Sequence, residues 1–253
     1  MTAPLHLGPA DFETLLQRLG PSLGVWRAAE VAVLRTQRYV HPVLDLGCGD
    51  GIVASLVLPR IDIGVDPSRE ALVRAARLGC YVRLEPVAIE DLALAPESVG
   101  TIMSNSVLEH VADLPLVLRT AARLLRPRGR LIFTSPTEAF SAWLALPSSR
   151  YAAWRNAHYE HRNLWTVPQW AHHLRQAGLQ IVSVRPYLRR GLVTVWDALE
   201  LAQRVWIGRR RLFSLLWRRV PPQQLARLAR RLARLDLSAP HPGGGRLIVA
   251  EKM

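Results

Sequence analysis

The nine residues from Val43 to Gly51 constrain the fold more than any other part of the chain. The first half of this stretch, VLDL, is apolar except for one Asp, and the second half carries glycine at positions 47, 49 and 51. An apolar pattern with helical spacing begins directly afterwards, at Ile52. This order predicts a buried strand, a tight turn and the start of a helix. Because glycine has no Cβ atom and tolerates positive φ, such a turn lets a ligand approach the backbone closely.

The residues of this stretch exclude two common phosphate-binding turns. The dinucleotide fingerprint requires a third glycine where Ile52 stands, and the P-loop requires a Gly-Lys-Ser/Thr sequence that is absent. Asp45 and Asp50 instead place two carboxylates at the rim of the turn. Phosphate sites favour amides and cations, so the acidic rim indicates a ligand with an amino group, hydroxyls or a positive charge.

Residues 43–51 closely resemble motif I of the class I S-adenosylmethionine-dependent methyltransferases. The resemblance implies that S-adenosylmethionine is the cofactor. It also implies that the turn binds this cofactor through Asp45, Gly47, Cys48, Gly49 and Gly51.

A second acid site follows the next predicted strand, which starts at Ile61. Asp66 comes 19 residues after Gly47, near the ~20-residue offset at which an acid meets a ribose. In the resembled family the acid at this place binds the ribose of the cofactor, and we carry that role to Asp66. The alternative, that Asp66 caps the following helix, fits Ser68 better because Glu70 and Ala71 follow in the first turn.

Strands and helices alternate along the chain after this point. Further strands are predicted at 81–84, 98–104, 131–135, 179–187 and 246–252, helices at 68–78, 114–125 and 166–176, and a turn at 126–130. This alternation predicts an α/β fold with a Rossmann-like, doubly wound sheet of seven mostly parallel strands. Ligands of such sheets bind outside the carboxyl ends of the strands. We therefore expect Gly47, Asp66, Glu90 and Asn105 to converge.

One position departs from the pattern of the resembled family. After the third strand, family members often carry an Asp near the adenine amino group, and Ala88 stands there in this chain. The adenine contact then falls to Glu90 or to the backbone around Ile89, although Glu90 is equally explained as a solvated loop acid. Asn105 is expected to contact the methionine end of the cofactor.

The segment after the fourth strand indicates which class of molecule receives the methyl group, called here the acceptor. The run Leu108-Glu109-His110-Val111 resembles a motif of many small-molecule methyltransferases. The chain lacks here both the Asp/Asn-Pro-Pro-aromatic run of amino-group DNA methyltransferases and the Pro-Cys pair of cytosine C5 enzymes. His110 is a candidate general base, with the alternative that it packs beneath the cofactor.

An irregular, aromatic segment follows the fifth strand, from Pro136 to Trp170. Folded over the cofactor, its rings would suit an apolar or planar acceptor, and Tyr159 or His161 would be a candidate to take the acceptor proton. The alternative is a polar surface loop whose aromatic residues pack in the core. His158 and His161 flank Glu160, but no Cys lies nearby and the spacing is not that of a metalloprotease, so no metal site is predicted.

The stretch from 189 to 245, named here the basic insertion, lies between two strands that a short turn would join. Its helical patterns, over 192–207 and in a basic run at 209–219, are widely apolar. Ten Arg but no acid occur from Leu201 to Leu235. Apolar faces flanked by arginines are typical of helices at an anionic membrane surface. Packing on the core or on a homodimer partner is the second interpretation, and nucleic acid is a less favoured third.

Composition and organisation complete the prediction. We divide the chain into an N-terminal helical cap (1–41, with Asp11 capping its first helix), a methyltransferase core (42–188 and 246–253) and the basic insertion (189–245). The chain carries two cysteines, and neither a signal peptide nor a run of about 18 apolar residues is evident. These features favour a cytoplasmic protein, peripheral on the inner face of the membrane.

The predicted activity is methyl transfer from S-adenosylmethionine to a small acceptor that is hydrophobic or linked to a lipid. Two alternatives stay open at this point. The first is an RNA methyltransferase that holds phosphates with its Arg-rich helices. The second is a non-catalytic protein that keeps the cofactor fold for binding, for which Ala88 is the hint.

Overall fold

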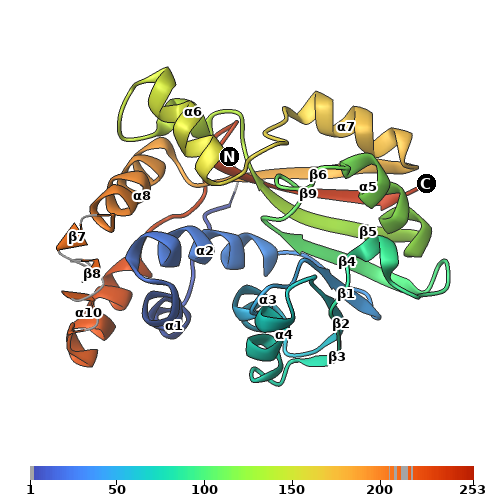
Figure 1. Cartoon of the computed structure of the whole chain (residues 1–253), viewed down its shortest axis with the longest axis horizontal. Helices are drawn as coiled ribbons and strands as arrows, with labels where there is room; N and C mark the ends of the chain where they lie inside the picture. Colours follow the sequence, from blue (N-terminus) through green and yellow to red (C-terminus); the bar gives the residue numbers. More distant parts are fainter. Residues whose placement is uncertain (1–2, 205, 208–209, 212–215, 218) are drawn as a thin grey trace.

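A seven-stranded sheet forms the centre of the protein (Figure 1). The structure is a computed structural model that describes residues 3–204, 206–207, 210–211, 216–217 and 219–253. From one edge to the other the strands are β3 (Tyr81–Glu85), β2 (Ile61–Val65), β1 (Val43–Leu46), β4 (Val99–Asn105), β5 (Leu125–Pro136), β9 (Gly245–Lys252) and β6 (Leu179–Tyr187). Only β9 is antiparallel to its neighbours in this sheet, β5 and β6. The predicted mostly parallel, Rossmann-like α/β fold is confirmed.

The strand order reverses between β1 and β4. From β1 the chain builds outward through β2 to β3, and it then returns to the other side of β1 with β4 and β5. At such a reversal the loops after two adjacent strands leave in opposite directions and open a crevice at the carboxyl edge. The glycine turn after β1 and Asn105 at the end of β4 therefore share this crevice.

Helices cover both faces of the sheet, as alternation of side chains along each strand requires. Val43 and Met103 pack toward a cluster that contains α1 (Pro9–Leu19), α2 (Pro21–Leu34) and α3 (Ile52–Val57). Leu44 and Ile102 pack toward a second cluster with α5 (Leu114–Leu124) and α7 (Val167–Gln176). Shorter elements complete the core: α4 (Arg69–Ala76), the 3-10 turns η1 (Ile89–Asp91) and η2 (Phe140–Trp143), and α6 (Ser149–His158).

The N-terminal cap forms two helices, as predicted, separated at Gly20. The predicted capping role of Asp11 is wrong. The first helix begins two residues earlier because Pro9, whose φ is pre-set for a helix, occupies its first turn after Gly8. Asp11 lies in that first turn and forms an ion pair with Arg35 at 2.6 Å. The second helix, α2, is buried along most of its length.

The boundary at the start of β5 also differs from the prediction. Residues 126–130, expected as a turn, belong to β5, which begins at Leu125. The pairing of β5 with β4 changes register between Val99 and Thr101, and Arg128 has a φ of 62°. An irregularity of this kind inserts residues into a strand without ending it, so the turn-forming sequence is absorbed by the sheet.

The basic insertion is helical at both ends, in α8 (Arg190–Ala202) and α10 (Pro222–Leu232). The predicted helix over 192–207 ends earlier than expected, since Trp206–Ile207 (β7) pairs with Arg210–Arg211 (β8) in a small second sheet. The predicted basic helical run at 209–219 falls partly outside the described residues.

Both insertion helices have packing partners within the chain. In α8, Val193 and Trp196 are buried in the cluster that contains α2; in α10, Leu225 and Ala229 are buried in the same cluster beside α1. The arginines of α10 and the turn after it face outward, at positions 227, 230, 231 and 234. In α8 and α10, part of the apolar surface that suggested a membrane is thus occupied by the protein's own core. Among the described residues no helix is both long and apolar enough for a membrane crossing.

Candidate active site

The glycine turn after β1 is shaped by close neighbours. Gly47, Gly49 and Gly51 have φ angles of 69°, 56° and 76°. A Cβ atom on Gly47 would lie 2.5 Å from a Val107 methyl carbon, and one on Gly51 would lie 2.7 Å from the Tyr81 ring. At Gly49 a Cβ would meet nothing within 4 Å, so only its backbone angle demands glycine. The turn is thus held tightly at both ends and open in the middle.

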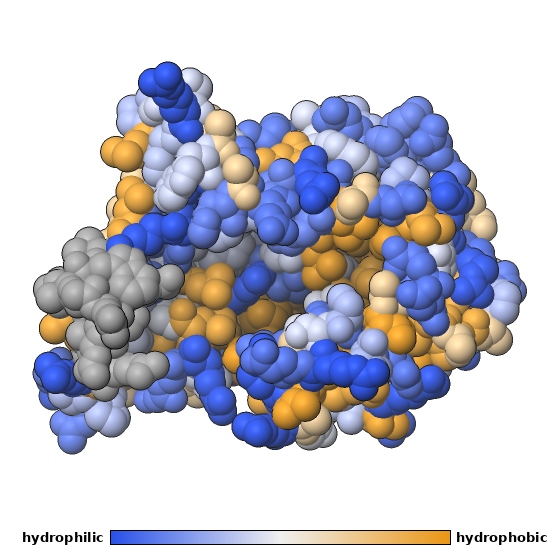
Figure 2. Space-filling model, viewed as in Figure 1, coloured by the Kyte–Doolittle hydropathy of each residue, from blue (hydrophilic) through white to orange (hydrophobic). Residues whose placement is uncertain are grey.

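A cavity of about 230 Å³, named here the cofactor cavity, opens beside this turn. Its walls bring together five of the predicted cofactor residues: Asp45, Gly47, Cys48, Gly49 and Asn105. Figure 2 shows a hollow near the middle of this face of the molecule, with apolar side chains on its floor. The carboxyl-edge crevice predicted from the fold is therefore a real cavity with a polar glycine rim.

Asp66 lies beside the turn, directly after β2. One of its carboxylate oxygens accepts a hydrogen bond from the Gly49 amide at 2.9 Å, and the other accepts one from the Ser68 amide at 2.8 Å. The predicted cap of α4 is confirmed, because the Ser68 hydroxyl accepts from the Ala71 amide. Asp66 is thereby fixed next to the glycine turn, where a ribose held by that turn would meet its carboxylate.

Asp45 is a buried carboxyl inside β1, not an exposed rim group. Only 2% of its surface is exposed, and it accepts a 2.6 Å hydrogen bond from the Tyr81 hydroxyl. Burial raises the pKa of Asp45 to about 7, the Tyr81 hydrogen bond opposes that rise, and the charge of Asp66 adds to it. Near neutral pH a cation in the cavity would draw Asp45 into its charged form.

Four predicted cofactor residues do not line the cofactor cavity: Asp66, which lies beside the turn, and Gly51, Ile89 and Glu90. Gly51 forms the N-cap of α3 at the end of the turn. Ile89 and Glu90 lie on η1; the side chain of Ile89 is buried in the core, so only its backbone is available, and Glu90 is half-buried. Their part in adenine binding stays a prediction.

Sequence reasoning missed Glu30, a fully buried acid on α2. Its carboxylate accepts hydrogen bonds from Trp26 Nε1 at 2.8 Å, Arg27 at 2.6 Å, the Ser106 hydroxyl at 2.6 Å and Asn105 Nδ2 at 3.0 Å. These bonds tie α2 to the end of β4. The one available signal was an acid within an otherwise apolar helical face.

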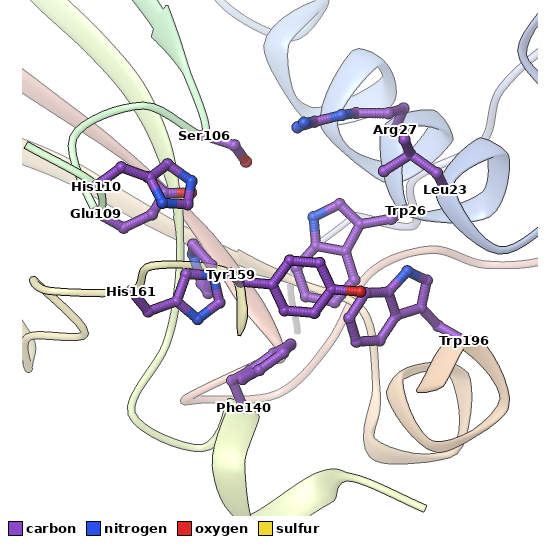
Figure 3. Close-up of a pocket in the computed structure, with 11 residues that line it drawn as sticks. Leu23, Trp26, Arg27, Ser106, Glu109, His110, Phe140, Tyr159, His161 and Trp196 are labelled. Atoms are coloured by element: carbon purple, nitrogen blue, oxygen red, sulfur yellow. The ribbon is translucent and has the colours of Figure 1, made fainter. Parts of the chain in front are cut away.

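A second cavity, named here the acceptor pocket, adjoins the first (Figure 3). It measures about 100 Å³, and Trp26, Phe140, Tyr159, His161 and Trp196 form most of its wall. Ser106, Glu109 and His110 lie together in Figure 3, on the side of the pocket away from Trp196. Both cavities are lined by Leu23, Arg27 and Ser106. Ligands bound in the two cavities would therefore lie next to each other, on either side of these shared residues.

The three predicted catalytic residues, His110, Tyr159 and His161, come together in this pocket. The ring of His161 lies 5.4 Å from that of His110 and 5.6 Å from that of Tyr159, between centroids. The Tyr159 hydroxyl donates to Glu200 at 2.8 Å, and burial raises its pKa, so Tyr159 stays protonated and serves as a wall.

Both histidines have Nδ1 beside an oxygen that only accepts; for His110 this is the Glu160 carbonyl, at 3.4 Å. The corresponding contact of His161 is with a side chain. The Nδ1 of His161 lies 3.2 Å from the amide oxygen assigned to Asn156, which accepts only, so Nδ1 carries the proton and Nε2 keeps a lone pair. Burial, with the charges of His110 and Arg155, lowers the pKa of His161 to about 4. Burial also lowers the pKa of His110. Both rings are neutral at neutral pH.

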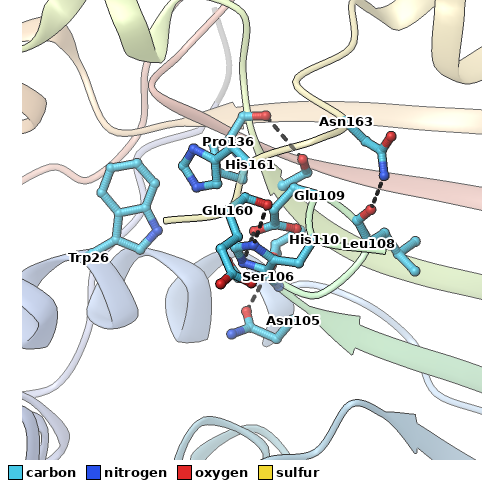
Figure 4. Close-up of polar contacts among 12 residues, drawn as sticks. Trp26, Asn105, Ser106, Leu108, Glu109, His110, Pro136, Glu160, His161 and Asn163 are labelled. Atoms are coloured by element: carbon cyan, nitrogen blue, oxygen red, sulfur yellow. Dashed lines mark hydrogen bonds and ion pairs between the residues drawn. The ribbon is translucent and has the colours of Figure 1, made fainter. Parts of the chain in front are cut away.

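Glu109 is a buried acid of this pocket that the sequence motif contained but did not mark as functional. It is 1% exposed, and its Oε2 has no hydrogen-bond partner among the described residues. Burial, together with the charge of Glu30, raises the pKa of Glu109 to about 8. Asn163 donates to the carbonyls of Leu108 and Val111 and so fixes the turn that carries Glu109 (Figure 4).

The far wall of the pocket is held by buried charges from α6 and α8. Arg155 and Asp197, both 0% exposed, form an ion pair at 2.6 Å. Asp197 also accepts from the Tyr151 hydroxyl and the Ala145 amide. The Arg155 guanidinium lies 4.8 Å from the ring centroid of Tyr159 and 5.2 Å from that of Trp196. Among the described residues no group of acids, histidines and cysteines suits a metal ion.

Comparison with known proteins identifies the family of this chain. The family described as a methyltransferase domain matches residues 14–184, a range that contains the whole cofactor cavity. Ubiquinone biosynthesis O-methyltransferases are similar in sequence. The protein of Rhizobium etli is 37% identical over 99 residues, 37% of this chain and 40% of that protein, and the protein of Serratia proteamaculans is 30% identical over 149 residues, 56% and 55%. The chain thus spans about half the length of the curated relatives it matches.

Solved structures extend the similarity of fold to the full chain. An S-adenosylmethionine-dependent methyltransferase from Thermotoga maritima superposes with a TM-score of 0.62 at 16% identity, covering 96% of this chain and 99% of that one. A geranyl diphosphate methyltransferase in complex with GPP and sinefungin has a TM-score of 0.57 at 17% identity, covering 100% and 90%. With the methyltransferase-domain match over more than half of its residues, the chain belongs to the class I S-adenosylmethionine-dependent methyltransferases.

Proposed function

We propose that the protein transfers a methyl group from S-adenosylmethionine to a hydroxyl oxygen of a small, hydrophobic, planar acceptor. The observation that carries this proposal is the adjacency of the two cavities, which share Leu23, Arg27 and Ser106. The cofactor cavity has the glycine turn that binds the cofactor in this family, and the acceptor pocket is small and lined by aromatic rings. Such adjacency allows two bound molecules to react without diffusion and with water excluded.

The residues of the cofactor cavity fit S-adenosylmethionine. The glycine turn leaves room where side chains would otherwise stand, Asp66 offers a carboxylate beside it, and Asp45 offers a buried carboxyl that suits an amino group or a cation. Asn105 is held by Glu30 with its amide at the cavity wall. When bound, the cofactor supplies an electrophilic methyl on a sulfonium, which is already activated, so the protein's task is mainly positioning.

On the acceptor side the protein must receive one proton. The acceptor oxygen forms a bond to the methyl carbon while the carbon–sulfur bond breaks, and the hydroxyl hydrogen leaves as a proton. His161 Nε2 has the free lone pair and the position in the pocket wall to take it. The cofactor side then leaves as one thioether and the acceptor as a methyl ether, and the positive charge of the sulfonium appears as the proton that His161 returns to water.

The relatives support oxygen as the atom that is methylated. The matched curated proteins are O-methyltransferases of ubiquinone biosynthesis. The aromatic wall of Trp26, Phe140 and Trp196 supports a planar acceptor, because rings pack favourably against rings. A lipid tail on the acceptor stays a prediction from the sequence.

The outward arginines of the basic insertion favour contact with an anionic surface. Arg227, Arg230 and Arg231 are exposed on α10, which has no acid between Pro222 and Leu232. We retain an anionic membrane surface as the first proposal for this face and RNA as the second, together with a cytoplasmic location and a homodimer as predictions. Binding to anionic vesicles at moderate salt would support the first, and steeply salt-dependent RNA binding would support the second.

Calorimetric titration with S-adenosylmethionine tests the proposed function. We expect micromolar affinity for the wild type and a loss of tenfold or more in Asp66→Ala, since hydrogen bonds to a charged group contribute about 1.5–3 kcal/mol each. Glu70→Ala, which removes an exposed acid of α4, is the matched control and should bind like the wild type. A folded wild-type protein that fails to bind would overturn the proposal and favour a role outside methyl transfer.

A further inference from the structure

The first helix of the basic insertion contributes to the acceptor pocket, although the sequence pattern suggested a membrane role for it. Trp196 of α8 is 6% exposed and lines the pocket. Its ring centroid lies 4.9 Å from that of Trp26, 5.5 Å from that of Phe140 and 5.8 Å from that of Tyr159. Figure 3 shows its indole closing the side of the pocket opposite His110.

The size of the pocket depends on this indole. The space within the pocket is about 100 Å³, and an apolar cavity of about 150 Å³ is known to bind benzene. One six-membered ring therefore fills the acceptor pocket after small adjustments, and the Trp196 indole blocks a fused second ring on its side of the pocket.

The indole also presents a polar atom that the protein leaves unused. Trp196 Nε1 is buried and has no hydrogen-bond partner among the described residues. Trp26, in the same pocket, gives its Nε1 hydrogen to Glu30 at 2.8 Å. A buried donor without a partner costs free energy that an incoming oxygen atom would recover. The pocket thus favours a ring that carries oxygen where it meets Trp196.

Trp196 is held in position by the contacts of two residues that follow it on α8. Asp197, the next residue, forms the buried ion pair with Arg155. Glu200, one turn further on, accepts hydrogen bonds from Tyr159 and from Ser22 of α2. The indole is therefore a fixed wall, anchored to α6 and to α2, and its effect on the ligand does not depend on a closing motion.

We propose that Trp196 selects the acceptor: its ring restricts the pocket to a single aromatic ring, and its N–H donates a hydrogen bond to an oxygen on that ring. This inference rests on the proposed function, in which the pocket holds the molecule to be methylated. It also assigns a reason to the long insertion, because α8 supplies a wall that a short turn between β6 and β9 would lack.

The test compares three probes of defined shape: phenol, toluene and 2-naphthol. Their dissociation constants are measured by ligand-observed NMR on the full chain without cofactor. Phenol and toluene are similar in size and differ in the oxygen, and 2-naphthol adds a second ring. For the wild type we expect phenol to bind about tenfold tighter than 2-naphthol and about fivefold tighter than toluene.

Two variants separate the two roles of the indole. Trp196→Ala should reverse the size preference, with 2-naphthol binding at least as tightly as phenol. Trp196→Phe keeps an aromatic ring and loses the N–H, so it should keep the discrimination against 2-naphthol and bind phenol and toluene equally. Val195→Ala, at the neighbouring and exposed position on α8, is the control and should behave like the wild type.

Each outcome decides the inference. An unchanged phenol-to-naphthol ratio in Trp196→Ala would overturn the size role, and an unchanged phenol-to-toluene ratio in Trp196→Phe would overturn the hydrogen bond. Should Trp196→Ala not fold, Trp196→Phe together with Trp196→Leu repeats the size test. Titration with S-adenosylmethionine is run in parallel: selective ring binding without cofactor binding would refute the proposed function and leave the selection by Trp196 standing.

Discussion

The cofactor cavity and the acceptor pocket are neighbours, yet they are built in opposite ways. The cofactor cavity is lined mainly by residues of one stretch, 45–54, and of the turn at 105–107, with Leu19, Leu23 and Arg27 from the N-terminal helices. The acceptor pocket takes its side chains from α2, the loop after β4, η2, the loop after α6 and α8 of the basic insertion. The first is a local structure that a strand and a turn define; the second exists only when five distant segments have packed.

The two sites also differ in how they are stabilised. Glycines with positive φ and backbone amides hold the cofactor side, while the acceptor side relies on stacked rings and on the buried pair of Arg155 and Asp197. A backbone cradle loses its shape when atoms are added to it. A side-chain pocket loses its shape when one buried partner is removed. These two statements lead to predictions that differ in kind and size.

Arg155→Met should have the largest effect. It leaves Asp197 buried without its cation, a situation that costs about 3–5 kcal/mol, and the free energy of unfolding in urea should fall by that amount. Arg150→Met, at an exposed position of the same helix, should change it by less than about 0.5 kcal/mol. The double variant Arg155→Met, Asp197→Leu should recover most of the loss, because no charge is then stranded. A loss below about 1 kcal/mol in the single variant would show that the pair is not structurally important.

The contrast between the sites explains what the sequence predicted and what it did not. The glycine turn, Asp66 and the cap at Ser68 are local patterns, so their structure followed from residues a few positions apart, and the order of strands followed from alternation. Trp196 lines the acceptor pocket and Glu200 binds the hydroxyl of Tyr159 in its wall. Both come from a segment whose apolar spacing was equally consistent with a membrane, a partner or the core. Periodicity shows that a helix has an apolar face, but it does not identify what covers that face.

Two further misses have the same cause. Glu30 binds four donors from α2 and from the end of β4, and this network has no sequence signature because its members are up to 76 positions apart. Tyr81 reaches Asp45 across β2. His110, Tyr159 and His161 were identified by residue type and by position after a strand, and their convergence in one pocket followed from the fold.

Gly47→Ala should have the second-largest effect, and it acts on the cofactor side alone. The added methyl would meet Val107 at 2.5 Å at a φ of 69°; left-handed strain costs about 1–2 kcal/mol, and a forced contact adds about 1–3 kcal/mol. Affinity for S-adenosylmethionine should fall more than tenfold, while phenol binding should be retained. Gly79→Ala has a similar φ with open space around the Cβ, so it should lose only the strain term and bind cofactor normally. Equal behaviour of the two variants would contradict the close fit at Gly47.

On the acceptor side, Glu109 should make the free energy of unfolding depend on pH. Its pKa of about 8 in the folded protein exceeds the ordinary value of 4.5, so folding favours the protonated acid. The stabilisation is complete below about pH 4.5 and is lost as pH rises toward 8, by about 1.4 kcal/mol per pH unit at most. Glu109→Gln removes this titration, so the difference in unfolding free energy between wild type and variant should shift in favour of the variant from pH 5 to pH 8 and level off above pH 9. A constant difference would show that Glu109 ionises normally.

Tyr81→Phe should have the smallest effect and should appear only on the cofactor side. The Tyr81 hydroxyl donates to Asp45 and lowers its pKa, so its removal raises that pKa above about 7. If ionised Asp45 attracts the positively charged cofactor, wild-type affinity for S-adenosylmethionine rises with pH through 7, and the variant's rise moves to higher pH, with a loss of about fivefold at pH 7 that is recovered by pH 9. Tyr151→Phe removes the matching hydroxyl from Asp197 in the acceptor side and should leave the cofactor titration unchanged. If the cofactor affinity of the wild type does not vary with pH, Asp45 does not attract the charge of the cofactor. Its buried carboxyl would then serve only the packing of β1 against Tyr81.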